Sequence, residues 1–81
     1  MKAEVYSKNN CPYCVKAEKL LLDSQIEYEK LDAVALREAL IDRVTADTGT
    51  APRSVPQIYI DGEYVGGYDQ LVPYLAERLQ K

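Results

Sequence analysis

The first half of the chain alternates between strand-like and helix-like patterns of apolar side chains. Polar and apolar residues alternate loosely over 2–6, which is typical of a short strand with one buried face. Strong helix formers then fill residues 15–23. Alternation returns over 26–31 and predicts a second strand. Apolar residues spaced four apart predict a second helix over residues 34–46.

The second half predicts a hairpin and a last helix. Residues 55–60 form the most strand-like run of the sequence, and residues 63–65 return as a partner strand. Between them lies Asp61-Gly62, a pair typical of tight hairpin turns. Leucines four residues apart then predict a final helix over residues 70–79.

This order of elements predicts a single α/β domain over residues 1–81. A strand–helix–strand opening joins two parallel strands through a crossover, and the closing hairpin adds antiparallel neighbours. We therefore expect a four-stranded mixed sheet flanked by three helices.

Composition narrows the possible functions mainly by exclusion. The chain is 47% hydrophobic and 28% charged, a composition typical of globular domains. We see no apolar run long enough to cross a membrane and none that would serve as a secretory signal. We expect a cytoplasmic monomer.

A net charge of −3 without a basic patch argues against nucleic acid as a partner. Because there is no histidine, histidine-based catalysis and histidine-ligated metals are excluded. All seven aromatic residues are tyrosines, which we expect at the margins of a Leu, Ile, Val and Ala core.

The candidate chemistry lies in the only two cysteines, Cys11 and Cys14. Cys11 falls at the start of the first predicted helix, where unpaired N–H groups and the helix dipole favour an anion. Cys-X-X-Cys thiols have pKa values of roughly 3.5 to 7.5, against about 8.5 for a free cysteine, and Lys8 adds positive charge nearby. Cys14 follows one turn later on the same side of the helix and is expected to be the more buried, resolving thiol.

Redox catalysis is not the only interpretation of this pair. A structural disulfide over so short a loop would stabilise the fold little. A zinc site needs four ligands and could form only between two chains. An iron–sulfur cluster shared by two chains is the stronger alternative, and two inert buried thiols fit the preceding polar turn poorly.

Two further segments have both a structural and a functional interpretation. Pro56 opens the best predicted strand, which indicates either an edge strand or a cis Val55–Pro56 bond that presents the Val55 backbone to a peptide. In Gly66-Gly67-Tyr68-Asp69-Gln70, we expect Asp69 to cap the last helix, and the same helix start can bind a carboxylate. Pro73 belongs in a first turn, so this helix is expected to begin near Asp69 or Gln70. Tyr13 is expected either to form a wall of the same cleft or to lie exposed.

Three motifs in this order and spacing resemble those of dithiol glutaredoxins: Cys11-Pro12-Tyr13-Cys14, Val55-Pro56-Gln57-Ile58 and Gly66-Gly67-Tyr68-Asp69. The resemblance covers essentially the whole chain. It implies a thioredoxin-like βαβαββα fold with a cis proline at Pro56 beside Cys11. It also implies glutathione as cosubstrate, no tightly bound cofactor or metal, Cys11 as the nucleophile and Cys14 as the resolving thiol.

The resemblance further implies which residues contact glutathione. Lys8 and Tyr13 would lie near its glycine carboxylate. Val55 and Pro56 would contact its cysteine, with the Val55 backbone pairing with the cysteine backbone. The γ-glutamyl end would be held by residues at the start of the last helix, which are Gly67, Tyr68, Asp69 and Gln70. Many glutaredoxins have an acidic residue where this chain has the neutral Gln70, which predicts weaker glutathione binding unless Asp69 takes over.

The expected function is therefore glutathione-dependent reduction of protein disulfides and of glutathionylated proteins. Ribonucleotide reductase is a possible client by family analogy. Two alternatives stay open, namely a dimer that binds an iron–sulfur cluster through Cys11 and glutathione, and a redoxin reduced by a flavoprotein thioredoxin reductase. Pro12 argues against the first alternative, and Gln70 keeps the second open.

Overall fold

The computed structural model describes residues 1–79 and confirms the predicted order of elements. The elements are β1 (Lys2–Ser7), α1 (Pro12–Asp23), β2 (Glu27–Asp32), α2 (Arg37–Thr48), β3 (Gln57–Ile60), β4 (Glu63–Gly66) and α3 (Tyr68–Leu79). Within these residues no helix has both the length and the apolar character that crossing a bilayer requires.

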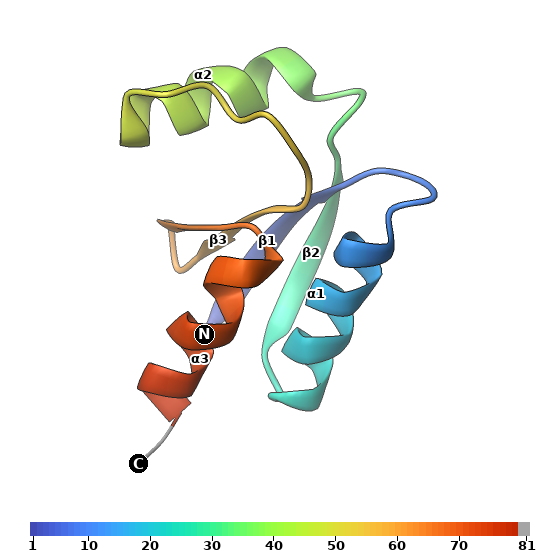
Figure 1. Cartoon of the computed structure of the whole chain (residues 1–81), viewed down its shortest axis with the longest axis vertical. Helices are drawn as coiled ribbons and strands as arrows, with labels where there is room; N and C mark the ends of the chain where they lie inside the picture. Colours follow the sequence, from blue (N-terminus) through green and yellow to red (C-terminus); the bar gives the residue numbers. More distant parts are fainter. Residues whose placement is uncertain (80–81) are drawn as a thin grey trace.

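The strands form one mixed sheet in the order β2-β1-β3-β4. β1 is parallel to β2 and antiparallel to β3, and β3 is antiparallel to β4. The β3–β4 turn has positive φ angles at Asp61 and Gly62, 52° and 80°, as expected for a hairpin turn that follows the twist of the strands. α1 and α3 lie on one side of the sheet and α2 on the other (Figure 1). The predicted α/β fold with a four-stranded mixed sheet is confirmed.

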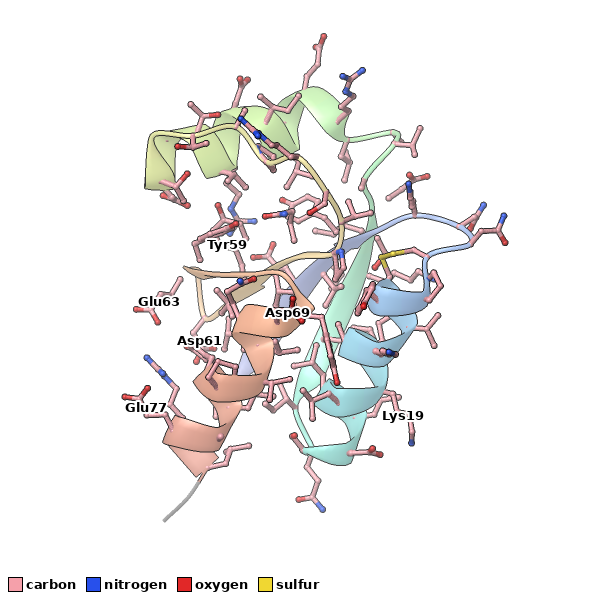
Figure 2. All side chains as sticks on the ribbon, viewed as in Figure 1. Lys19, Tyr59, Asp61, Glu63, Asp69 and Glu77 are labelled. Atoms are coloured by element: carbon pink, nitrogen blue, oxygen red, sulfur yellow. A yellow bond between two sulfur atoms is a disulfide. The ribbon has the colours of Figure 1, made fainter. Side chains whose placement is uncertain are left out.

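Successive side chains of the two central strands, β1 and β3, point to opposite faces of the sheet. They therefore contribute to two hydrophobic cores, one on each face. Val5 and Ile58 face α1 and α3 together with the other members of the larger core, which are Ala3, Ala17, Leu21, Ile26, Ile60, Leu71 and Leu75. Tyr6 and Tyr59 face α2 with Ala33, Leu40 and Val44. The expectation that tyrosines lie only at the margins is wrong, because Tyr59 is 0% exposed and sits beneath α2 (Figure 2).

Polar partners on α2 explain why tyrosines can be buried there. The Tyr59 hydroxyl donates a 2.6 Å hydrogen bond to Asp47 Oδ2, and the Arg43 guanidinium lies 3.7 Å from the centre of the Tyr59 ring. Arg43 also donates to Tyr6 Oη at 3.0 Å and to Glu4 Oε1 at 2.9 Å. A buried hydroxyl with a partner avoids the cost of desolvation, so the second core holds hydroxyls without leaving them unsatisfied.

The start of α2 lies three residues later than predicted. The Asp32 carboxylate accepts hydrogen bonds from the N–H groups of Val34 and Ala35 at 2.9 and 3.1 Å. This local bonding holds residues 33–36 in a turn, which is how Asp competes with helix formation. α2 ends at Thr48, two residues later than predicted, and is followed by Gly49, whose φ is +78°.

α3 begins at Tyr68, earlier than Pro73 suggested, so Pro73 lies in the second turn and not in the first. A proline inside a helix removes one N–H···O=C bond. The helix nevertheless continues through Leu75, since Leu71 and Leu75 on either side of the proline are buried in the larger core.

Candidate active site

Cys11 and Cys14 form a disulfide at the N-terminal end of α1, visible as the yellow bond in Figure 2. Cys11 is the N-cap residue with extended backbone, and Pro12 takes the first helical position, where a missing N–H costs nothing. The N–H of Cys14 donates to Cys11 Sγ at 3.2 Å. The first turn contains no acidic residue. This environment favours negative charge on the Cys11 sulfur when the disulfide is reduced.

The two cysteine residues differ in their solvent exposure. Cys11 is 8% exposed, whereas Cys14 is 1% exposed and shares its buried helix face with Ala17 and Leu21. An incoming disulfide can therefore reach Cys11 more readily than Cys14. The expected order of burial is confirmed.

Val55 and Pro56 lie directly beside Cys11. The Val55–Pro56 peptide bond is cis, as the family resemblance implies. The edge-strand interpretation is wrong, because Pro56 precedes β3 and β3 lies between β1 and β4. The carbonyl oxygen of Val55 is 3.8 Å from Cys11 Sγ. Since a disulfide sulfur carries no hydrogen, this approach is a contact in the oxidised protein, and the reduced thiol could donate along it.

The start of α3 is capped by Gln70 and not by Asp69. Gln70 Oε1 accepts a 2.9 Å hydrogen bond from the Gly67 N–H, and Gly67 O accepts from the Leu71 N–H at 3.0 Å. Gly67 thus takes the N-cap position, and Gln70 closes the reciprocal bond of a capping box. The prediction of Asp69 as the cap is wrong, because the helix begins one residue before Asp69. Gly66 has a φ of +121°, which favours glycine at this position.

A cleft of about 320 Å³ lies between the start of α1, the loop before β3 and the start of α3. Seven of the eight residues predicted to bind glutathione line it, together with Ser54: Tyr13, Val55, Pro56, Gly67, Tyr68, Asp69 and Gln70. Tyr13 is 53% exposed, and its ring centre lies 6.0 Å from that of Tyr68. Tyr13 is therefore both exposed and a wall of the cleft. Figure 2 shows Asp69 at the start of α3.

Lys8 does not line this cleft. It lines a separate hollow that contains Cys11 and Cys14. The structure therefore places Lys8 beside the cysteines, where its charge can favour a thiolate, and outside the space that the other predicted residues share.

Gln57 supports the cleft without lining it, and the sequence did not reveal this role. Its side chain is buried, and Nε2 donates to the Ser54 carbonyl at 2.8 Å. Its Oε1 accepts a 2.6 Å hydrogen bond from the Tyr64 hydroxyl, and burial raises the pKa of Tyr64. Gln57 thereby ties the loop that lines the cleft to the β3–β4 hairpin. Its position directly after Pro56 was the only signal in the sequence.

Among residues 1–79 no group of three or more Cys, His, Asp or Glu side chains could hold a metal ion. The bonded sulfurs of Cys11 and Cys14 can be reduced to two thiols and reoxidised to the disulfide. Thiol–disulfide exchange needs a sulfur that a substrate can reach and a second thiol beside it. Cys11 is the more exposed of the two cysteines, and Cys14 is bonded to it in the oxidised protein.

Comparison with known proteins gives consistent similarities. The family model of glutaredoxins matches residues 3–65. The chain is 36% identical over 78 residues to glutaredoxin 1 of Rickettsia conorii, covering 95% of this chain and 76% of that protein. It is 38% identical over 71 residues to glutaredoxin 3 of Escherichia coli K12, covering 84% and 78%. It also matches hybrid peroxiredoxin hyPrx5 of Haemophilus influenzae with 36% identity over 72 residues; the match covers 89% of this chain but spans only 28% of that longer protein.

Solved structures agree with the sequence matches. Oxidized Escherichia coli glutaredoxin superposes with a TM-score of 0.78 and 27% identity over the full length of both chains. A buckwheat glutaredoxin–glutathione complex superposes with a TM-score of 0.74 and 27% identity, covering 98% of this chain and 70% of that one. The thioredoxin-like fold implied by the resemblance is thereby confirmed.

Proposed function

The chain belongs to the glutaredoxin family and is a thiol–disulfide oxidoreductase, and from this premise we propose that glutathione is its reductant. The observation that carries the proposal is the position of Cys11. It caps α1, contacts the Val55 carbonyl and is the more exposed of the two cysteines. We also propose a cytoplasmic location, where glutathione keeps protein thiols reduced.

The proposed reaction begins with the Cys11 thiolate. It attacks one sulfur of a substrate disulfide, forms a mixed disulfide, and the other substrate sulfur leaves as a thiolate that takes a proton. Cys14 then attacks Cys11 Sγ and releases the substrate with both sulfurs reduced. The two electrons come from the two thiols of the enzyme, which is left as the Cys11–Cys14 disulfide.

Two glutathione molecules restore the dithiol. The first attacks Cys11 Sγ, which frees the Cys14 thiol and leaves a Cys11–glutathione mixed disulfide. The second attacks the glutathione sulfur of that mixed disulfide, so that glutathione disulfide departs and the Cys11 thiolate returns. With a glutathionylated substrate, the Cys11 thiolate attacks the glutathione sulfur, and the substrate sulfur leaves as a thiolate that takes a proton. One glutathione then attacks the glutathione sulfur of the Cys11–glutathione disulfide as above, and Cys14 takes no part.

The cleft whose wall residue Val55 contacts Cys11 Sγ supports glutathione as the ligand. The Val55 backbone lines this cleft and can pair with the cysteine of an extended tripeptide, and Tyr13 and Tyr68 form an aromatic wall. Asp69, an exposed carboxylate in the first turn of α3, can pair with the γ-glutamyl ammonium. The buckwheat relative was solved as a glutathione complex. The positive charge of Lys8 would favour the thiolate form of Cys11.

A comparison of reductants tests this proposal. Reduction of a glutathionylated peptide is followed with glutathione and glutathione reductase, and separately with NADPH and a flavoprotein thioredoxin reductase. We expect rapid turnover with glutathione and slow turnover with the flavoprotein. The reverse ranking would identify a redoxin that depends on a reductase, and visible iron–sulfur absorbance in the purified protein would favour the cluster-binding dimer.

A further inference from the structure

The hollow that contains Cys11 and Cys14 also includes an acidic residue. We call it the cysteine hollow; it measures about 540 Å³, and its lining residues are 8–12, 14, 15, 18 and 30. Among residues 1–79, Glu18 is the only acidic residue in this lining. Glu18 follows Cys14 by four residues on α1, a spacing that makes two side chains neighbours on the helix surface. A carboxylate therefore shares the hollow with the two sulfurs.

Side chains from two strands hold Glu18 in place. Its Oε2 accepts a 3.3 Å hydrogen bond from the Ser7 hydroxyl at the end of β1, and its Oε1 accepts a 3.1 Å hydrogen bond from the Tyr28 hydroxyl of β2. α1 lies alongside β2 (Figure 1), and Lys30 Nζ of β2 lies 4.0 Å from Glu18 Oε2. The Glu18 side chain is only 16% exposed, so water screens its charge less than that of a surface carboxylate.

The two cations that line the cysteine hollow offset this charge only in part. Lys8 is exposed and the Lys30 side chain is 59% exposed, so solvent screens both of them more than it screens Glu18. The two hydrogen bonds to Glu18 do not require a charge either, because a neutral amide could accept them as well. The fold therefore places a weakly screened negative charge beside the cysteines, where the start of α1 and Lys8 favour a thiolate.

We propose that the Glu18 carboxylate makes the protein a stronger reductant by raising the free energy of its thiolate form. The inference rests on the thiol–disulfide exchange of the proposed function. Reduction of the Cys11–Cys14 bond takes up two electrons and one proton and leaves a Cys14 thiol and a Cys11 thiolate. The electrons come from two glutathione molecules, which leave as glutathione disulfide. The bonded sulfurs carry no charge, so repulsion from Glu18 destabilises the reduced form alone. Glu18 acts only through the charge on Cys11 and is not a catalytic residue.

The redox equilibrium with glutathione tests the proposal. The test variant Glu18→Gln keeps an acceptor for the hydroxyls of Ser7 and Tyr28 and removes the charge. The control variant Glu77→Gln removes the same charge from the exposed surface of α3 (Figure 2). The fraction of each protein in the disulfide form is measured across ratios of glutathione to glutathione disulfide at several pH values. The thiolate absorbance of each reduced protein is followed over the same pH range.

At neutral pH, the equilibrium constant for reduction should be about fivefold larger in Glu18→Gln than in the wild type, which is about 20 mV for a two-electron couple. The thiolate of Glu18→Gln should persist to lower pH, and Glu77→Gln should match the wild type. The difference should vanish at pH values low enough to protonate both thiols, because a carboxylate does not repel a neutral thiol. A purely structural effect of the substitution would change the equilibrium by the same factor at every pH.

An unchanged equilibrium in Glu18→Gln would overturn the proposal, as would a shift towards the disulfide or a shift that does not depend on pH. An equal shift in Glu77→Gln would also overturn it, because the position of the charge would then not matter. Slow turnover of the wild-type protein with glutathione would instead overturn the proposed function, since an equilibrium constant does not depend on the rate.

Discussion

Gln70 Oε1 accepts a 2.9 Å hydrogen bond from the N–H of Gly67 and so closes the first turn of α3. The neutral side chain at this position therefore has a structural role at the edge of the cleft. It leaves Asp69 as the only carboxylate that lines the cleft among residues 1–79. In the proposed glutathione complex, the γ-glutamyl end would depend on Asp69 alone for negative charge.

Replacing Gln70 with Glu should tighten glutathione binding. The glutamate can keep the bond to Gly67 and add a charge near the γ-glutamyl ammonium, and an exposed ion pair contributes about 0.2–1 kcal/mol. We expect the KM for glutathione to fall by up to about fivefold, because RT is about 0.6 kcal/mol. Steady-state kinetics with a glutathionylated peptide measure this change.

The matched variant Gln70→Leu separates the two roles of the side chain. It removes the capping hydrogen bond without adding charge, so the free energy of unfolding should fall by about 0.3–1.5 kcal/mol. The KM for glutathione should not fall. A lower KM in Gln70→Leu would show that added charge is not what tightens binding in Gln70→Glu.

Gln57 should matter for binding because it holds the Ser54 carbonyl. Gln57→Leu leaves this carbonyl and the Tyr64 hydroxyl without their partner, at a cost of about 1–3 kcal/mol in unfolding free energy. The loop 54–56 is then less well held, and the KM for glutathione should rise by up to about tenfold, equivalent to about 1.4 kcal/mol. Tyr64→Phe is the control, since it keeps the bond to Ser54. A comparable rise of KM in Tyr64→Phe would show that the Ser54 contact is not responsible.

Stability at high pH should depend on Tyr59. Burial, and then the hydrogen bond to Asp47, raise the pKa of Tyr59 above its ordinary value of 10.0. A group whose pKa is raised by folding stabilises the fold fully below its unfolded pKa and loses that contribution as the pH rises above it. Stability should therefore decline above about pH 10.

Tyr59→Phe isolates this contribution. The variant should be less stable than the wild type by about 1.5–3 kcal/mol near neutral pH, because the hydrogen bond from Tyr59 to the Asp47 carboxylate is lost. The difference should shrink above about pH 10. Tyr28, Tyr64 and Tyr74, whose pKa values are also raised, titrate in both proteins and cancel. Urea unfolding at several pH values measures this, and a difference that grows at high pH would contradict it.

The sequence predicted the fold because its signals are local and agree with one another. Period-two alternation gave the strands, Asp61-Gly62 gave the hairpin turn, and the leucines of α3 gave the last helix. The cysteine pair and the Val55–Pro56 loop identified the site for the same reason. Residues 11–14 and 54–56 lie at element ends that the sheet topology brings together.

The features that the sequence did not reveal depend on contacts that its periodicity does not encode. Tyr59 is buried because Arg43 and Asp47 on α2 meet its ring and hydroxyl. The role of Gln57 likewise depends on two hydrogen bonds, one that it donates to the Ser54 carbonyl and one that it accepts from the Tyr64 hydroxyl. The early start of α3 reflects the cap between Gly67 and Gln70, which stabilises the first turn although Pro73 then falls in the second.

The central claim is that Cys11 performs the first attack and Cys14 resolves only protein disulfides. Turnover of Cys11→Ser and Cys14→Ser is measured with glutathione on a glutathionylated peptide and on a protein with one reducible disulfide. Cys11→Ser should lose both activities, whereas Cys14→Ser should keep the first and lose the second. Full activity of Cys11→Ser on either substrate would contradict the claim.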